Sequence, residues 1–260
     1  MRDLPPLDCH AHISPEIDPR TLEGLGAVTL IATRSVQEFQ SVAGRSDLVS
    51  VWGVGCHPSL VRTQAAFDAK AFQKAMELTP FVAEVGLDGG SRVPLEKQQQ
   101  TLRAVLGLLE ATPRIVSVHS HKATGEVLAL LAASKGADGL VLHWWRGDEE
   151  QTARAIALGC YFSINFSMIR LTDGWRSIPL DRVLVETDHP AGDRFSVKPR
   201  QPGRVQPVEA ALAAHHNLAA RDIRLRIWAN FARMVRDTNV FELMPVPIRR
   251  MVEAAAPGTN

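Results

Sequence analysis

The sequence has few cysteines and no cysteine pair of the kind that binds structural zinc. Its three cysteines, Cys9, Cys56 and Cys160, lie too far apart for the Cys-x-x-Cys spacing of a zinc knuckle. An odd number of thiols, each in an expected strand, favours reduced and buried side chains over a disulfide framework. No local base marks Cys9 or Cys56 as a nucleophile, so we interpret both as packing residues.

The sequence also lacks a long apolar run and a surplus of either charge. No run is long enough to span a bilayer, and residues 1–6 contain no apolar segment of the kind that directs secretion. We therefore expect a soluble, cytoplasmic protein with no membrane partner. Lysine and arginine total 29 against 28 acidic residues, so any preference for nucleic acid must come from a local patch.

What the sequence does contain is a series of apolar runs that alternate with helical stretches. The chain has 260 residues, 45% of them hydrophobic, which is enough for one large core, and it shows no solenoid repeat. We expect a single domain over residues 1–260 with an α/β fold, a (β/α)8 TIM-like barrel; an open, doubly wound sheet is the alternative. The expected strands are the opening run up to Cys9 and residues 27–33, 48–55, 81–85, 115–118, 139–142, 160–164 and 183–186.

Helices are expected between and after these strands, at residues 36–45, 65–78, 94–111, 124–135, 148–158, 168–177, 208–219 and 222–237. The polar run 96–100 within the third of them is expected to face solvent, at least in part. Residues 191–206 are rich in Gly, Pro, Arg and Lys and predict a long loop, and residues 254–260 predict a disordered tail.

Several of the apolar runs end in a histidine or a carboxylate. Since the carboxyl ends of parallel strands open onto one face of a barrel, we expect these side chains to share one site. His10 and His12 face the same side because side chains alternate along an extended segment. The residues at the ends of expected strands are His10, His12, His57, Glu84, His119, His143 and Asp188.

This set of side chains predicts a metal centre. Two histidines and two carboxylates could hold one cation, and two further histidines a second, provided that Glu84 is shared. Imidazole-rich ligation suits zinc, manganese, iron or nickel, whereas magnesium prefers oxygen, so the residue types leave the metal open. A pair of ions about 3.5–4 Å apart lowers the pKa of a shared water and clamps the attacking and leaving oxygens of a displacement. The pattern therefore predicts hydrolysis, with Asp188 as general base.

Six motifs follow one another in an order that resembles the TatD-like metal-dependent hydrolases of the amidohydrolase superfamily. That family carries His-x-His, Gly-x-His-Pro, Gly-Glu-Ile-Gly-Leu-Asp, His-Ser, His-Cys-Phe-Ser-Gly and Glu-Thr-Asp-x-Pro. The stretch 159–165 also looks like its seventh strand, and the resemblance covers the chain from about Leu7 to Pro190. The motifs stand here as Asp8-Cys9-His10-Ala11-His12, Gly55-Cys56-His57-Pro58, Ala83-Glu84-Val85-Gly86-Leu87-Asp88, Val118-His119-Ser120-His121, Leu142-His143-Trp144-Trp145-Arg146-Gly147 and Glu186-Thr187-Asp188-His189-Pro190.

The resemblance implies two divalent metal ions, of zinc, magnesium or manganese. It also implies catalytic roles for Asp188, Glu84 and His57, with His57 in contact with the substrate phosphate or the leaving group. By this resemblance the first ion is bound by His10, His12, Glu84 and Asp188, and the second by Glu84, His119 and His143.

The resemblance also implies a substrate and partners. Known members act as DNases on phosphodiester bonds, which makes DNA the implied substrate. Within the family, Asp88-Gly89-Gly90, His143-Trp144-Trp145 and the segment after Pro190 look most like the TatD-like component of bacterial Qat anti-phage systems. That likeness implies protein partners in a multi-component system and a role in antiviral defence.

Some positions depart from the usual motifs of the family. His121 stands where Arg or Cys is usual, and His189 where a small residue is usual; each is a candidate ligand, phosphate contact or proton donor, or an ordinary polar residue at the rim. Trp144 and Trp145 replace a Cys-Phe pair, and we expect one to stack on a base and the other to pack in the core. The candidate substrate-binding residues are His57, His121, Trp144, His189, Arg194 and Arg200.

A cluster of basic residues follows the last motif. Arg194, Lys198, Arg200 and Arg204 could grip a nucleic-acid backbone, and a solvated surface is the alternative. Asp8 is expected to be a structural carboxylate rather than a metal ligand.

Two further functions remain open from the sequence. The same centre could hydrolyse a phosphate ester, or a cyclic amide or ester, of a small molecule. Alternatively, the barrel could be a binding subunit of a larger assembly with little activity of its own, although a complete ligand set argues against that.

Overall fold

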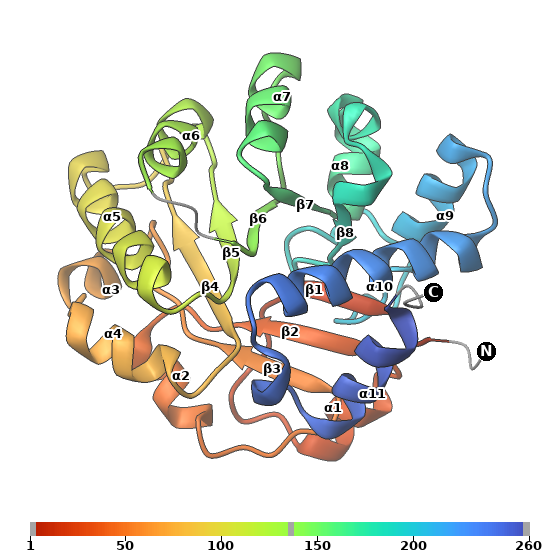
Figure 1. Cartoon of the computed structure of the whole chain (residues 1–260), viewed down its shortest axis with the longest axis horizontal. Helices are drawn as coiled ribbons and strands as arrows, with labels where there is room; N and C mark the ends of the chain where they lie inside the picture. Colours follow the sequence, from red (N-terminus) through yellow and green to blue (C-terminus); the bar gives the residue numbers. More distant parts are fainter. Residues whose placement is uncertain (1–3, 135–137, 257–260) are drawn as a thin grey trace.

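The structure is a computed structural model that describes residues 4–134 and 138–256 (Figure 1). In these residues eight strands, all paired in parallel, alternate with helices. The strands are almost entirely buried, as parallel strands are when helices cover one face and a packed core fills the other. They are β1 Leu7–Ala11, β2 Val28–Ala32, β3 Ser50–Gly53, β4 Phe81–Gly86, β5 Ile115–His119, β6 Leu140–His143, β7 Tyr161–Ile164 and β8 Val183–Val185.

The strands follow one another in sequence order, as in a TIM-type α/β barrel. Continuous ladders join β1 to β3 and β4 to β8. Backbone hydrogen bonds link the two sheets on both sides: among them, the Cys56 amide donates to the Glu84 carbonyl (3.0 Å), and the Asp188 amide donates to the His10 carbonyl (2.8 Å). An open, doubly wound sheet would reverse its order at a switch point, so the predicted barrel-like order is confirmed.

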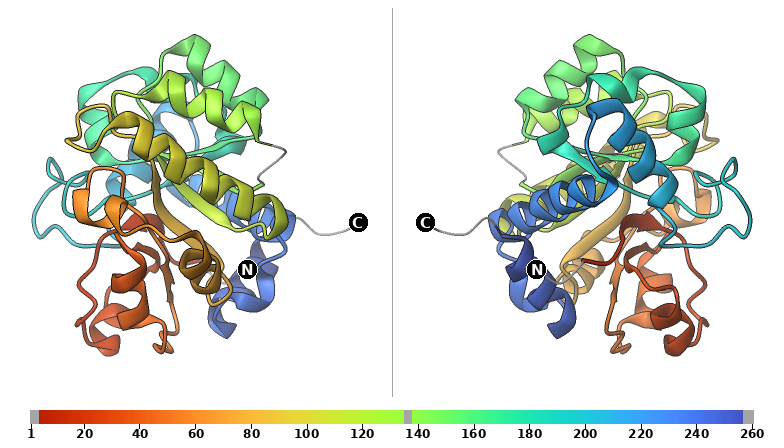
Figure 2. Two further views of the ribbon diagram at one scale, coloured as in Figure 1. Left: turned by 90° about the vertical axis from the view of Figure 1, so that its left-hand side faces the viewer. Right: turned by 90° about the vertical axis from the view of Figure 1, so that its right-hand side faces the viewer.

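Helices surround the strands (Figures 1 and 2). No helix in the described part of the chain is both long and apolar enough to cross a bilayer. The helices are α1 Pro19–Gly24, α2 Val36–Val42, α3 Val61–Ala65, α4 Ala69–Met76, α5 Leu95–Ala111, α6 Thr124–Ala133, α7 Glu149–Ala157, α8 Phe166–Leu171, α9 Gln206–His216, α10 Ala220–Asp237 and α11 Val246–Ala255, with short 3-10 turns η1 Gly174–Ser177, η2 Leu180–Arg182 and η3 Phe241–Leu243.

The predicted helix at 65–78 was wrong at its start, because the chain forms two helices there. The side chain of Asp68 accepts a hydrogen bond from the Ala71 amide (2.7 Å) and begins α4 at Ala69. The predicted helix at 168–177 is likewise divided into α8 and η1. Two short helices, α1 and α11, were not predicted.

The polar run at 96–100 faces solvent in part, as expected, since Glu96 and Gln100 are exposed. Gln98 of the same run is fully buried. Its side-chain amide accepts from the Asp88 amide (2.7 Å) and donates to the carbonyls of Asp88 (3.1 Å) and Val93 (2.8 Å), which ties α5 to the loop after β4. Ala254 and Ala255 belong to α11 rather than to a disordered tail, and residues 257–260 lie outside the described residues.

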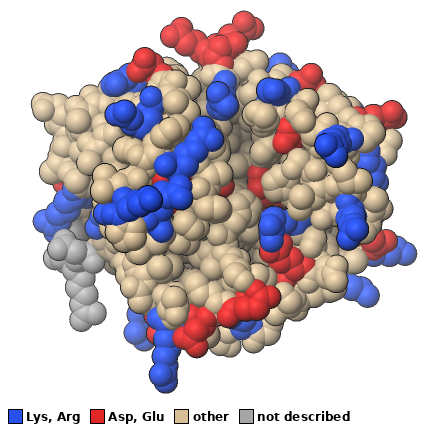
Figure 3. Space-filling model, turned by 180° about the vertical axis from the view of Figure 1, so that it is seen from behind, with Lys and Arg blue, Asp and Glu red and all other residues tan. Residues whose placement is uncertain are grey.

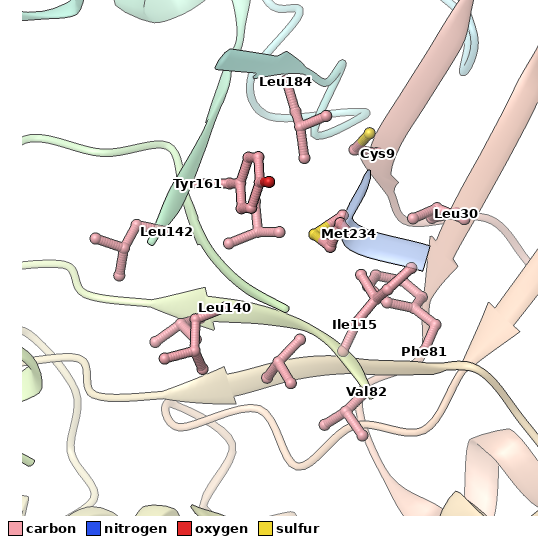
Figure 4. Close-up of a cluster of buried hydrophobic side chains, with 14 of the residues drawn as sticks. Cys9, Leu30, Phe81, Val82, Ile115, Leu140, Leu142, Tyr161, Leu184 and Met234 are labelled. Atoms are coloured by element: carbon pink, nitrogen blue, oxygen red, sulfur yellow. The ribbon is translucent and has the colours of Figure 1, made fainter. Parts of the chain in front are cut away.

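Helix α10 covers the end of the barrel where the strands begin. The Trp228 indole donates to the Pro5 carbonyl (2.8 Å), just before β1, and the Asn230 amide donates to the Val183 carbonyl (2.8 Å) at the start of β8. Met234 of the same helix lies among side chains of several strands, Cys9 and Tyr161 among them (Figure 4). The amino ends of the strands are therefore closed, and the carboxyl ends are free to form a site.

The loop expected at 191–206 contains no helix or strand until α9 begins at Gln206. In both views of Figure 2 this loop projects from the side of the molecule opposite α11. The three cysteines are free and buried, as expected.

Candidate metal centre at the barrel mouth

The side chains expected to bind metal meet at the carboxyl ends of the strands. Most of them line a cavity of about 360 Å³, and His10 lies fully buried beside it. Figure 3 shows the face of the molecule opposite α10, hollowed between Lys and Arg side chains. The centre brings together His10 and His12 from the end of β1, Glu84 from β4, His119 from β5, His143 from β6 and Asp188 from the segment after β8.

Four donor atoms form the first half of the centre. The Nε2 atoms of His10 and His12 are 3.4 Å apart, and each lies 3.8 Å from Asp188 Oδ1. Glu84 Oε2 completes the group, 3.4 Å from His12 Nε2 and 3.8 Å from His10 Nε2. An ion with tetrahedral bonds of 2.0–2.2 Å separates its ligands by about 3.3–3.6 Å, so this group fits one cation.

Hydrogen bonds fix which nitrogen of His12 faces the centre. Its Nδ1 lies 3.0 Å from the Ala32 carbonyl, which can only accept, so Nδ1 carries the proton and Nε2 presents a lone pair. His10 Nδ1 pairs with the Ser117 hydroxyl (2.6 Å), which holds that ring in place.

His57 has the opposite arrangement. Its Nδ1 accepts a hydrogen bond from the Ser59 amide (3.1 Å), so in the neutral ring the proton is on Nε2. That Nε2 lies 3.3 Å from Glu84 Oε2. His57 is therefore arranged as a hydrogen-bond donor to the centre and not as a ligand.

The second half of the centre uses the other oxygen of Glu84. Oε1 lies 2.5 Å from His119 Nδ1 and 2.7 Å from His143 Nε2, and these two nitrogens are 3.2 Å apart. Oε2 has no hydrogen-bond partner in the described part of the chain although Glu84 is buried. A buried carboxylate oxygen without a donor is costly, and a cation would remove that cost.

The charges in the centre shift the pKa values of its members. Burial alone would raise the pKa of Glu84, but the imidazoles of His57, His143 and His119 outweigh it and hold that pKa well below its usual value. Burial raises the pKa of Asp188 to about 7, and the neighbouring Glu186 and Glu84 carboxylates act in the same direction. In the metal-free centre Asp188 is therefore partly protonated near neutral pH, and a bound cation would displace that proton.

The imidazoles of the centre divide into two groups by the direction in which their pKa values are shifted. Burial lowers the pKa of His10, and the His143 imidazole acts in the same direction; burial likewise lowers the pKa of His57. Burial also opposes protonation of His12, His119 and His143, but Glu84 outweighs it in each case and raises their pKa values.

Two buried carboxylates support the centre from behind. Asp8 accepts hydrogen bonds from the Thr187 amide (2.8 Å), the Thr187 hydroxyl (2.6 Å) and the Gly203 amide (2.7 Å), which ties the residue before Asp188 to a residue near the end of the 191–206 loop. Glu186 accepts from Asn165 Nδ2 (2.9 Å) and the Trp144 amide (3.1 Å), and it lies 3.8 Å from His143 Nδ1.

The predicted substrate contacts separate into two groups. His57, His121, Trp144 and Arg194 line the cavity, whereas His189 and Arg200 are not among its lining residues. The guanidinium carbon of Arg194 lies 5.8 Å from the centre of the Trp144 ring. His189 is instead bound to Asp193, 2.7 Å from Nδ1 to Oδ2.

Of the two adjacent tryptophans, Trp145 is the buried one. Its indole donates to the Thr152 hydroxyl (2.9 Å), and the side chain packs in the core. Sequence reasoning missed Arg146 as a lining residue, although it stands inside the quoted motif that begins at Leu142. Glu186 and Asp88 were also missed, although both stand inside quoted motifs, in Glu-Thr-Asp and Gly-Leu-Asp.

Comparison with known proteins agrees with this geometry. The sequence model of a family described as TatD related DNase matches residues 7–236. The chain is 30% identical over 209 residues to YcfH of Escherichia coli K12, described as an uncharacterized metal-dependent hydrolase, covering 75% of this chain and 77% of that protein. It is 26% identical over 239 residues to human deoxyribonuclease TATDN3, covering 81% and 85%.

Solved structures give the same fold. YJJV, a TatD homolog from Escherichia coli K12, matches with a TM-score of 0.73 at 20% identity and covers 92% of this chain and 98% of its own. A TatD-family hydrolase from Entamoeba histolytica matches with a TM-score of 0.71 at 14% identity, covering 90% and 99%.

Proposed function

Because the chain belongs to the TatD-related DNase family of metal-dependent hydrolases, we propose that it is a deoxyribonuclease that uses two divalent ions to cleave phosphodiester bonds. One observation carries this proposal: the two oxygens of Glu84 face separate groups of donors. Oε2 faces His10, His12 and Asp188, and Oε1 faces His119 and His143. A carboxylate shared in this way supports two adjacent ions rather than one.

When bound, such ions would polarise a water molecule and neutralise charge on the phosphate. Asp188 is the proposed general base, since its carboxylate borders the cavity and lies 3.8 Å from the Nε2 atoms of His10 and His12, beside the place where a water-activating ion would bind. His57 is proposed to donate its Nε2 proton in a hydrogen bond to a phosphate oxygen. The imidazole-rich donor set supports zinc or manganese over magnesium.

The wall of the cavity supports a nucleotide as the bound group. Arg146 and Arg194 would bind phosphate oxygens, and the ring of Trp144 would stack on a base. His121 also borders the cavity and would contact the same phosphate. The neutral whole-molecule charge makes these local cations the proposed source of DNA affinity.

A second candidate is hydrolysis of a small phosphate ester, or of a cyclic amide or ester. The cavity volume of about 360 Å³ favours it, since this lies near the lower end of the range for small-molecule pockets. A role inside a multi-protein antiviral assembly is a further proposal, supported by the likeness of His143-Trp144-Trp145 to the Qat component. Assay of the chain alone and together with its co-expressed partners would test that role.

The test of the main proposal is nucleotide release from end-labelled single- and double-stranded DNA by protein reconstituted with zinc, manganese or magnesium. Cleavage should disappear in His10→Ala and Asp188→Asn. His216→Ala and Asp173→Asn, which lie outside the centre, are matched controls and should remain active.

The same protein should be offered a chromogenic phosphodiester and a simple lactone. Cleavage of either without cleavage of DNA would favour the small-molecule candidate. Failure on all substrates with each metal would contradict the hydrolase proposal for the isolated chain.

A further inference from the structure

A third group of metal-binding side chains lies beside the two that share Glu84. Asp88 follows β4, and His119 and His121 lie at the end of β5. Asp88 Oδ1 is 3.1 Å from His121 Nδ1, and Asp88 Oδ2 is 3.5 Å from His119 Nε2. One donor atom from each of the three residues lies within 4.8 Å of the others, so a single ion could contact all three.

The Asp88 carboxylate is held in place before any ligand arrives. The Gly90 amide donates to its Oδ1 (2.8 Å), and Gln98 of α5 binds both the amide and the carbonyl of Asp88. This support fixes the backbone, so the carboxylate keeps one oxygen toward each imidazole. Such preorganisation is typical of a binding site built on a rigid scaffold.

The two ring nitrogens of His119 face different groups of side chains. Its Nδ1 belongs to the centre around Glu84, whereas its Nε2 is buried and has no hydrogen bond of good geometry among the described residues. The 3.5 Å separation from Asp88 Oδ2 is long for an N–H···O hydrogen bond. It does match the separation of about 3.0–3.6 Å between two ligands of one cation.

His121 completes this group from the segment just after β5. Its imidazole side chain is 39% exposed, on the wall of the cavity. The group is therefore open to solvent on one side.

We propose that Asp88, His121 and the Nε2 atom of His119 form a third site for a transition-metal ion, beside the two-metal centre. His119 would bridge the second and third ions through its two nitrogens as an imidazolate, and its ring proton would be released to solvent as the third ion binds. The remaining positions on the third ion would face the cavity, where a water or a phosphate oxygen could occupy them. Two imidazoles and one carboxylate favour zinc or manganese. Because one ligand is shared and another is exposed, this site should fill last.

The proposal is tested by counting ions and does not depend on any substrate. Metal-free protein is dialysed against increasing zinc or manganese, and bound metal per chain is measured by elemental mass spectrometry. The wild-type chain should bind two ions tightly and a third more weakly. His121→Ala and His121→Arg should still bind two, with affinity for the third reduced by more than about tenfold.

Control variants separate this site from general damage. His216→Ala should bind three ions, and melting curves followed by circular dichroism show whether each variant is folded. Asp88→Asn should also lose the third ion. If the wild-type chain saturates at two ions, or if a third ion persists in His121→Ala, the proposal is wrong. In the first case Asp88 serves only as a hydrogen-bond partner of the two histidines.

Discussion

Two histidines at the mouth of the barrel differ in which ring nitrogen carries the proton, and this separates their roles. His12 donates from Nδ1 to the Ala32 carbonyl and turns a lone pair toward the centre, whereas His57 accepts at Nδ1 from the Ser59 amide. We predict that His12→Ala lowers metal affinity by more than about tenfold. His57→Ala should leave the number of bound ions unchanged and lower kcat. Bound metal per chain and steady-state kinetics on one sample measure both effects.

One result would contradict the roles assigned to His12 and His57. Loss of an ion in His57→Ala would make that residue a ligand and overturn the assignment from its hydrogen bonds. His216→Ala again serves as the control, since it removes an imidazole from the end of α9.

Protons should compete with metal in this centre. In the metal-free protein Glu84 raises the pKa values of His12, His119 and His143 against the effect of burial. A proton on one of these nitrogens must leave before a metal ion can bind there, so affinity should fall as the pH is lowered through the raised pKa values. The expected change is about tenfold per pH unit for each proton displaced.

Calorimetry checks this competition directly. Zinc binding measured at one neutral pH in two buffers of different ionisation enthalpy should give different apparent heats, because released protons are taken up by the buffer. Equal heats in both buffers would mean that the imidazoles are already unprotonated, contrary to the raised pKa values.

At the residue scale, the sequence identified every proposed ligand of the two-metal centre, but neither Asp88 of the proposed third site nor the details that assign the roles. The ligands stand in local motifs, as in His10-x-His12, and a motif can be recognised without the fold. The partner of His12 is a carbonyl on the neighbouring strand, and Asp8 meets Thr187 from the other end of the chain. Contacts of this kind depend on strand register, which no local pattern specifies.

At the scale of elements, Asp8 connects β1 to the segment after β8 and to the end of the 191–206 loop. It is fully buried and accepts three hydrogen bonds from Thr187 and Gly203. We predict that Asp8→Ala lowers the free energy of unfolding by about 2–4 kcal/mol, because buried donors lose their acceptor. The same change should weaken metal binding, since Thr187 precedes Asp188. Urea unfolding and metal titration measure the two effects, with the exposed Asp173→Ala as control.

The end of β6 presents Trp144 to the cavity. Its amide is held by Glu186, and its ring borders the cavity near Arg194. If the proposed DNase function holds, Trp144→Ala should weaken binding of a short single-stranded oligonucleotide by about 5- to 150-fold, as expected for one lost base stack. Trp144→Phe should keep most of the affinity. Fluorescence anisotropy with a labelled oligonucleotide gives these values.

A matched control exists for this substitution. Phe241 is also an aromatic ring beside a guanidinium, that of Arg249 at 5.9 Å, but it lies in η3, near the start of β3 and away from the mouth. Phe241→Ala should not change oligonucleotide affinity. An equal loss in both variants would point to a general effect on folding.

Strands and helices could be predicted from the sequence where their residues show a strong hydrophobic pattern. All eight strands were expected because each is an apolar run, and the long helices α5 and α10 were expected from their periodicity. The start of α4 was misplaced because the cap at Asp68 competes with an apolar face that continues upstream through Phe67. Helix α1 has six residues, too few to give a periodic signal, whereas α11 has ten, with Ile248 and Val252 on its buried face, and its pattern was overlooked.

At the scale of the whole molecule, contacts that stabilise the barrel and the side chains of the metal centre lie at opposite ends of the strands. Helix α10 closes the amino ends of the strands through Trp228, Asn230 and Met234. The metal centre occupies the opposite end, on loops and strand ends. The sequence predicted the barrel from the order of its elements, but not that α10 closes its base, because that contact joins segments far apart in the chain.

This separation leads to a final prediction at Asn230. Its buried amide donates to the carbonyls of Leu180 (2.9 Å) and Val183 (2.8 Å), at the start of β8. Asn230→Leu leaves both carbonyls without that donor and should lower the free energy of unfolding by about 2–3 kcal/mol. Since the centre lies at the other end of the barrel, bound metal per chain at low temperature should not change. Urea unfolding and metal analysis, with the exposed Arg226→Ala as control, would test this, and loss of metal from the folded variant would show that the two ends are coupled.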